Sequence, residues 1–190
     1  MNRDLKLALI SLIINVAFAI CNFVLGFVTI SWWLLTLGSY YLILSIVRFV
    51  VICFKSRESF ITRFTGWILI VLSVPLVGTV ILSVVKDRGH KLHMIVMIAM
   101  AAYAFAKITL ATIKFIKAHR KTSATITTLQ YISFAEALVS IFALQRSMLV
   151  SFEGMTEAEI VIMNALLGTA VCVVVLILGF KLLKNKNKTA

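Results

Sequence analysis

Charged residues and helix-breaking residues are scarce in this chain. Only 14% of its 190 residues are charged, seven are acidic, and Pro75 is the only proline. Apolar residues make up 62% of the chain, and the mean hydropathy is +1.07. This composition excludes an ordinary soluble domain, in which about 25% of residues are charged. We therefore expect an all-α, polytopic membrane protein.

Cysteine and histidine, three of each, are also sparse. Cys21, Cys53 and Cys172 lie in apolar sequence without paired spacing, which argues against a disulfide framework and against a thiolate metal site. No HExxH motif occurs, and the histidines lie near the ends of the apolar runs. The serines have no suitable histidine and acid partners for nucleophilic catalysis. We therefore expect no enzyme, no metal site and no cofactor.

Apolar runs of membrane-spanning length follow one another along the whole chain. At about 20 residues per span, they account for six helices with short connections and no soluble domain. The expected spans are residues 7–30, 32–54, 64–85, 92–116, 125–150 and 158–183. The sequence thus predicts a single domain, residues 1–190, built as a bundle of six transmembrane helices.

Lysine and arginine gather on one side of this predicted bundle. They occur at both termini and around the second and fourth connections, as Arg3, Lys6, Arg48, Lys55, Arg57, Arg63, Lys114, Lys117, Arg120, Lys121, Lys181, Lys184, Lys186 and Lys188. The positive-inside rule places that side in the cytoplasm. Only the third connection, with Lys86, Arg88 and Lys91, differs. We expect both termini in the cytoplasm and a multi-pass protein of the cell inner (cytoplasmic) membrane.

A net charge of +12 could also indicate a protein that binds nucleic acid. The basic residues flank helix ends, however, where each adds about 1 kcal/mol of attraction to anionic head groups. The expected partner is therefore the lipid bilayer, with anionic head groups on the cytoplasmic side, and not nucleic acid.

Two ionisable residues, Lys107 and Glu136, lie deep inside the fourth and fifth spans. At 1.5 Å per residue, Lys107 is ~15 Å and Glu136 ~18 Å from the cytoplasmic ends of their helices. A charge at this depth costs roughly 2.5–3.5 kcal/mol on insertion scales, so it usually has a partner or a function. Because neighbouring antiparallel helices usually pack side by side, a direct ion pair is geometrically reasonable, although sequence alone does not establish the contact.

Further polar residues share helix faces in the first and fifth spans. Three recur with Glu136 at steps of three and four, and two asparagines are seven apart: Gln130, Ser133, Ser140, Asn15 and Asn22. One interpretation is a hydrated path in which Glu136 exchanges protons or holds a cation, with Lys107 as a switchable counter-charge. The other is a static contact that fixes the register of the helices.

Several short segments are similar to a known transporter family. They are Asn22, Gly26, Ser31, Leu34-Leu35, Gly38-Ser39-Tyr40-Tyr41, Arg63-Phe64-Thr65-Gly66 at the entry to the third span, and Phe134-Ala135-Glu136-Ala137 in the fifth. They resemble the membrane domain of cation diffusion facilitator transporters. Six helices with both termini inside agree with that family. The resemblance implies a transporter-like bundle.

The chain departs from this family at the metal site. The family binds zinc through four His or Asp side chains on the second and fifth helices, because a tetrahedral ion needs converging ligands. Here Tyr40, Leu44, Val139 and Ala143 occupy those positions. The cytoplasmic metal-binding domain that usually follows the sixth helix is also expected to be absent. The resemblance therefore implies a degenerate relative without zinc activity.

Two classes of function stay open. The first is a small transporter-like protein, ion- or proton-coupled through Lys107 and Glu136. The second is a non-transporting membrane subunit, scaffold or regulator in which that pair is structural. A homodimer is also compatible with family analogy, with the alanines of the fourth span, and with the small residues Ala165, Gly168 and Cys172 in the sixth, although sequence does not establish it.

Overall fold

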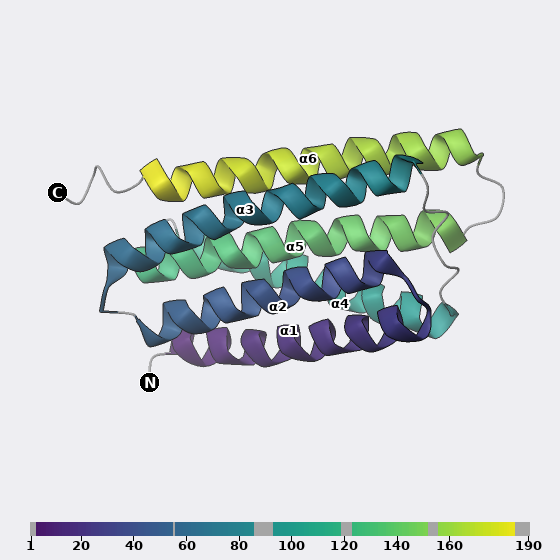
Figure 1. Ribbon diagram of the computed structural model, residues 1–190. Helices are drawn as coiled ribbons and strands as arrows, with labels where there is room; N and C mark the ends of the chain where they lie inside the picture. Colours follow the sequence, from purple (N-terminus) through teal and green to yellow (C-terminus); the bar gives the residue numbers. More distant parts are fainter. Residues whose placement is uncertain (1–2, 55, 86–92, 119–122, 152–155, 185–190) are drawn as a thin grey trace.

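A computed structural model describes residues 3–54, 56–85, 93–118, 123–151 and 156–184. These residues form six α-helices that lie alongside one another in a bundle (Figure 1). The helices are α1 (Arg3–Val28), α2 (Trp32–Cys53), α3 (Glu58–Val85), α4 (Met94–Ala118), α5 (Ala124–Ser151) and α6 (Glu157–Lys184). The all-α, six-helix architecture expected from the sequence is confirmed.

Every one of these helices is long and apolar enough to cross a membrane. Large apolar side chains also point outward, and Phe27 and Ile95 are each 71% exposed. Soluble monomers rarely expose large contiguous apolar surfaces, whereas lipid tails solvate them well. The six helices therefore indicate a multi-pass membrane protein.

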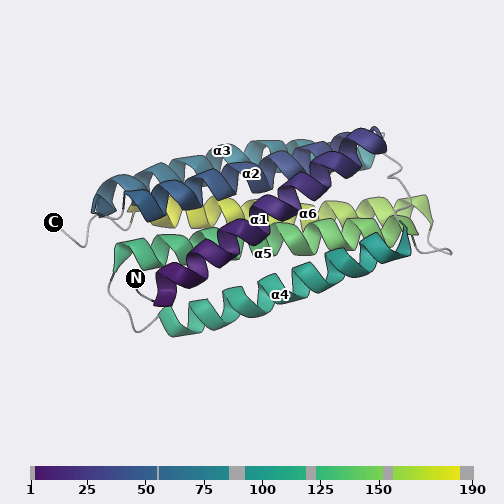
Figure 2. The ribbon, with the colours of Figure 1, turned by 90° about the horizontal axis from the view of Figure 1, so that it is seen from below.

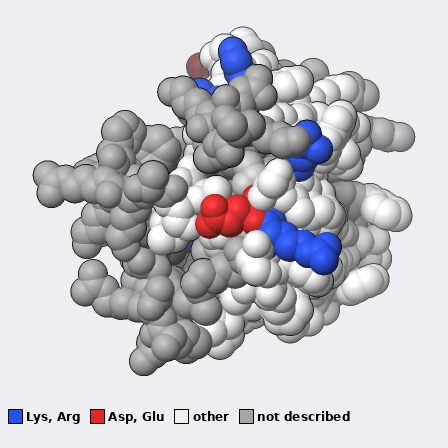
Figure 3. Space-filling view, turned by 90° about the vertical axis from the view of Figure 1, so that its left-hand side faces the viewer, with Lys and Arg blue, Asp and Glu red and all other residues white. Residues whose placement is uncertain are grey.

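The exposed lysine and arginine residues of the described ranges lie at one end of the bundle. The start of α1, the end of α6 and the connection between α2 and α3 all lie at this end, on the left in Figure 1. We call it the terminal end, and the opposite one the far end. Exposed charged residues at the terminal end include Arg57, Glu58, Arg63, Lys181 and Lys184. Figure 3 shows acidic and basic side chains next to each other on this face.

The main difference from the expected spans is the start of α3. This helix begins at Glu58, well before residue 64, where the predicted span starts. Ile61 in the added turn is fully buried. Glu58 accepts hydrogen bonds from Ser123 (3.0 Å) and Thr125 (3.2 Å) near the start of α5. The added turns are therefore fixed by packing and by hydrogen bonds, and Gly66 lies inside the helix rather than at its entry.

Helix α5 lies at the centre of the bundle. It contacts α2, α3, α4 and α6, and 56% of its apolar stretch is buried. Helix α4 lies at the edge, against α5, and only 22% of its apolar stretch is buried (Figure 2). The other two extensive pairings are α1 with α2 and α3 with α6. Side chains of α5 are thus shielded on most sides, whereas much of α4 is accessible to lipid.

Glycines let α3 and α6 approach each other closely. A Cβ atom on Gly66 would lie 3.0 Å from the backbone oxygen of Gly179, and a Cβ atom on Gly179 would lie 3.0 Å from that of Gly66. Both distances are shorter than ordinary van der Waals contact, so the two backbones can approach only where side chains are missing. We call this contact the glycine seam.

The small residues considered for a homodimer divide into two groups. Gly168 and Cys172 on α6 are buried within the chain, and a Cβ atom on Gly168 would lie 3.0 Å from the ring of Phe142. Ala99, Ala102 and Ala106 on α4 are exposed. The buried pair on α6 therefore serves internal packing. Ala165 on α6, which is half-buried, and the alanines of α4 are the small residues that reach the surface.

The turn between α1 and α2 has a left-handed residue that is not glycine. Ile30 has φ 51°, and the backbone N–H of Ser31 donates to the carbonyl oxygen of Gly26 (2.9 Å). This bond closes the end of α1 as in a Schellman motif, where glycine usually occupies the left-handed position. The turn is therefore tight, and it strains the β-branched Ile30.

Candidate functional site

Glu136 is the centre of a buried polar site near the middle of the bundle. Its side chain is completely buried. Oε2 accepts hydrogen bonds from Lys107 Nζ (2.8 Å, on α4) and from Arg48 (2.9 Å, on α2). Oε1 accepts a hydrogen bond from the Asn15 amide on α1. Lys107 and Glu136 are thus in direct contact, and four helices meet at one carboxylate.

Asn15 connects the acid to the base. Its amide nitrogen donates to Glu136, while its amide oxygen accepts hydrogen bonds from Lys107 Nζ and from the Tyr103 hydroxyl (3.0 Å). Both ends of one buried amide are thus used, which fixes its orientation. We call Asn15, Arg48, Lys107 and Glu136 the charge cluster.

Arg48 overturns one expectation from the sequence. The sequence places it among the basic residues that flank the cytoplasmic helix ends, yet it is only 1% exposed. Its guanidinium donates to Ser11 on α1 and to Ser133 on α5 (2.9 Å) in addition to Glu136. Arg48 lies close enough to the end of α2 to resemble a flanking cation, but its long side chain is held inside by three acceptors.

A signal for Arg48 was nevertheless present in the sequence. It lies between the apolar residues Ile46-Val47 and Phe49-Val50-Val51. A single cation with apolar neighbours on both sides is the same pattern that singled out Lys107. Arg48 was not recognised as a buried residue because other basic residues follow it closely, in the connection after α2.

The remaining predicted site residues divide between the cluster and its surroundings. Ser133 contacts Arg48, as described above. The Ser140 hydroxyl donates to the backbone oxygen of Glu136 (2.7 Å) and shares a hydrogen bond with the Tyr41 hydroxyl (2.7 Å). Asn22 is buried but donates to the backbone of its own helix, at Phe18 (2.7 Å). Gln130 is only half-buried. The predicted stripe on α5 is therefore interior from Ser133 to Ser140.

Three aromatic rings cover the cluster on the side of the far end. Phe18 stacks on Tyr103 with 3.8 Å between ring centroids, and Tyr41 meets both rings edge-on at 5.1 and 5.9 Å. Lys107 Nζ lies 5.4 Å from the centroid of Tyr103. These rings were not predicted as site residues. They separate the charges from the far half of the bundle.

The charge cluster contains more positive than negative charge. With all three ionisable groups charged, two cations face one carboxylate, which leaves a net charge of +1. An arginine side chain does not release its proton in proteins, but a lysine side chain can. Lys107 is therefore the cation whose proton can leave, and its loss would make the cluster neutral.

The four residues that the resemblance in the sequence aligned with zinc ligands are apolar or aromatic. Tyr40, Leu44, Val139 and Ala143 are all buried in the apolar core. Across the described ranges, no three His, Cys, Asp or Glu side chains gather closely enough to hold a metal ion. The buried charged residues of the described ranges are the three of the charge cluster and Arg146 on α5.

No family model matches this chain, and neither a curated protein nor a solved structure gives a significant match.

Proposed function

We propose that this protein is a small transporter-like membrane protein, ion- or proton-coupled through the charge cluster. One observation carries the proposal: a fully buried carboxylate has two competing cations, Arg48 from α2 and Lys107 from α4. Ionisable residues inside membrane helices commonly mark ion pathways and proton relays. A carboxylate with two alternative partners can keep one while it releases the other.

The working step is the exchange of one proton at Lys107. The protonated amine holds α4 to Glu136 on α5 and to Asn15 on α1. Loss of the proton removes the ion pair but leaves Glu136 paired with Arg48. The attachment of α4 thus changes while the contact between α2 and α5 persists. Because α4 is the least buried of the spanning helices on its apolar stretch, it is the helix that this change can move most easily.

A second function is favoured by the complete burial of Glu136. In that case the protein is a non-transporting subunit, scaffold or regulator, and the cluster fixes the register of four helices. Buried polar groups serve this purpose in some proteins, because only one arrangement satisfies all of them.

We further propose the setting in which either function operates. The terminal end faces the cytoplasm, the protein lies in the inner membrane, and anionic head groups contact the exposed basic residues of that end. The exposed alanines of α4 are where a homodimer would form. The similarity to the cation diffusion facilitator membrane domain is proposed as a distant relationship without the zinc site.

Proton flux into proteoliposomes tests the transport proposal. A potassium diffusion potential drives protons, and a trapped pH-sensitive dye reports them. We expect flux above that of empty vesicles for the wild type and none above that level for Lys107→Met. Lys181→Met is the matched control, because Lys181 is an exposed lysine at the terminal end. If Lys107→Met conducts as fast as the wild type, the proton does not pass through Lys107 and the static function is favoured.

A further inference from the structure

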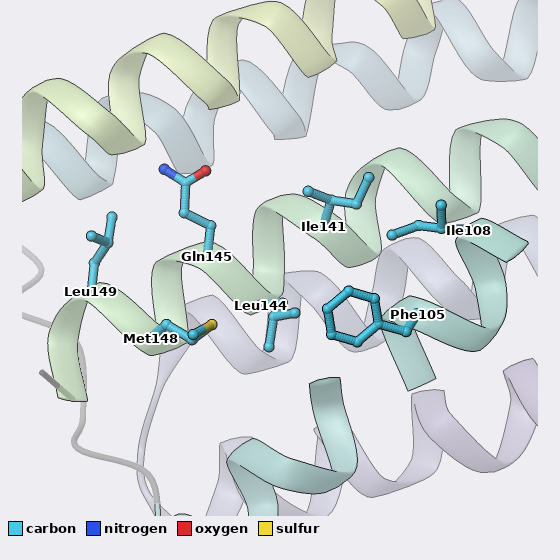
Figure 4. Close-up of a pocket in the computed structure, with 7 residues that line it drawn as sticks. All are labelled: Phe105, Ile108, Ile141, Leu144, Gln145, Met148 and Leu149. Atoms are coloured by element: carbon cyan, nitrogen blue, oxygen red, sulfur yellow. The ribbon is translucent and has the colours of Figure 1, made fainter. Parts of the chain in front are cut away.

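An apolar groove runs between α4 and α5, from the middle of the bundle towards the far end. Its volume is about 520 Å³, within the range of roughly 300–1,000 Å³ typical of ligand pockets. It is lined by Phe105, Ile108, Ile141, Leu144, Gln145, Met148 and Leu149 (Figure 4). The steps of three and four place the α5 residues on one face of that helix. Phe105 is 64% and Met148 38% exposed, so the groove is open at the surface.

The lining of the groove is hydrocarbon. None of its residues is charged, and Gln145 is the only one with a polar side chain. The Gln145 amide donates to the backbone oxygen of Met163 on α6 (3.0 Å), and Figure 4 shows it pointing away from Leu144 and Phe105. A ligand in this groove therefore meets apolar side chains and needs no polar partner there.

The groove also has the position and length of one leaflet. From Ile141 to Leu149 it extends ~12 Å along α5 at 1.5 Å per residue. Half of the hydrocarbon core of a bilayer is about 15 Å thick. Leu149 lies near the last residue of α5, where head groups are found, and Ile141 lies deeper in the span. The groove thus runs from head-group level at the far end towards the middle of the bilayer.

We infer that this groove binds one acyl chain of a membrane lipid from the leaflet at the far end. The bilayer supplies this hydrocarbon wherever α4 and α5 cross it. The chain enters beside Leu149 and ends beside Ile108, so that it fills the space between the two helices. This site does not depend on the charge cluster or on the transport proposal.

A photoreactive lipid tests this site. The probe is a phosphatidylcholine with a diazirine near the middle of one acyl chain, at low fraction in vesicles of unlabelled phosphatidylethanolamine and phosphatidylglycerol that contain the protein. After illumination, mass spectrometry locates the label. We expect it on Phe105, Leu144 and Met148, about tenfold above Ile98 and Phe180, a ratio equivalent to ~1.4 kcal/mol. Ile98 and Phe180 are 58% and 59% exposed outside the groove. Even labelling of all these residues would overturn the proposal.

Filling the groove provides the second arm of the test. We expect Leu144→Trp to lower labelling of Phe105 about tenfold, and Ile98→Trp, the control on the exposed face of α4, to leave it unchanged. If circular dichroism shows that Leu144→Trp is misfolded, Met148→Trp, at a more exposed position, replaces it as the variant that fills the groove. If the tryptophan variants change the dimer fraction but not the labelling of Phe105, a second copy occupies the groove and the proposal is wrong.

Discussion

Two regions of this bundle are held together by opposite means. Around Glu136, four helices meet through charges and hydrogen bonds, and the side chains that reach inward are long. Along the glycine seam, α3 and α6 can approach closely because the glycines have no side chains. Van der Waals contact between the two backbones stabilises this pairing. The charge cluster favours one arrangement of its helices because buried polar atoms need hydrogen-bond partners. The glycine seam favours one arrangement of α3 and α6 because it leaves no space for a side chain between them. The two regions should therefore respond to different kinds of substitution.

The largest effect is expected from Glu136→Gln. This change removes the only negative charge of the cluster and leaves Arg48 and Lys107 facing each other. Removing one partner of a buried ion pair costs about 3–5 kcal/mol, because it leaves an uncompensated charge. Unfolding in detergent, followed by circular dichroism, measures the loss. The double variant Glu136→Gln with Lys107→Met should lose less, since it leaves one buried cation instead of two. Strictly additive losses would contradict the contact between the two residues.

A methyl group should suffice to disturb the glycine seam. We expect Gly66→Ala to destabilise the protein by roughly 1–3 kcal/mol, as overpacking does, because the new Cβ atom meets the backbone of α6. Gly78→Ala is the matched control on the same helix, since nothing lies within 4 Å of a Cβ atom there. The control should be neutral or slightly stabilising, because alanine favours the helix over glycine. Equal melting temperatures for the two variants would show that the seam is not close-packed.

Lys107→Met should separate function from stability within the cluster. The variant loses a charged hydrogen bond but leaves the balanced pair of Arg48 and Glu136. We expect the stability to stay within about 1 kcal/mol of the wild type, far less than the loss for Glu136→Gln. The same detergent unfolding assay checks this value. A loss as large as that of Glu136→Gln would mean that Arg48 cannot compensate the carboxylate alone.

The smallest effect is expected at the turn between α1 and α2, outside both regions. Ile30→Gly should stabilise the protein by about 1 kcal/mol relative to Ile30→Ala, because only glycine adopts φ 51° without a Cβ clash. The alanine variant removes the same exposed side chain but keeps the Cβ atom. A comparison of their thermal melts isolates the strain, and identical melts would argue against a left-handed Ile30.

Much of the candidate site could be recognised from the sequence. Lys107 and Glu136 stood out because each is an ion in an apolar run, and their similar depth in neighbouring helices made a contact geometrically reasonable, which the structure then showed. Asn15, Ser133 and Ser140 followed from helical spacing. Arg48 was missed because basic residues follow it closely in the chain. Tyr41 and Tyr103 were missed because an aromatic residue in a membrane helix has no distinct pattern, and only packing shows which ring covers a charge.

The sequence by itself determined the class of this protein and the number of its helices. Length and apolarity of the runs are local properties, and each membrane helix satisfies its own backbone hydrogen bonds. Only the tertiary structure decided that α5 is central, that α3 packs on α6 through Gly66 and Gly179, and that Arg48 turns inward. These outcomes depend on which faces of distant helices meet. A helix in lipid can pack through several apolar faces at similar free energy, so the choice requires all six helices together.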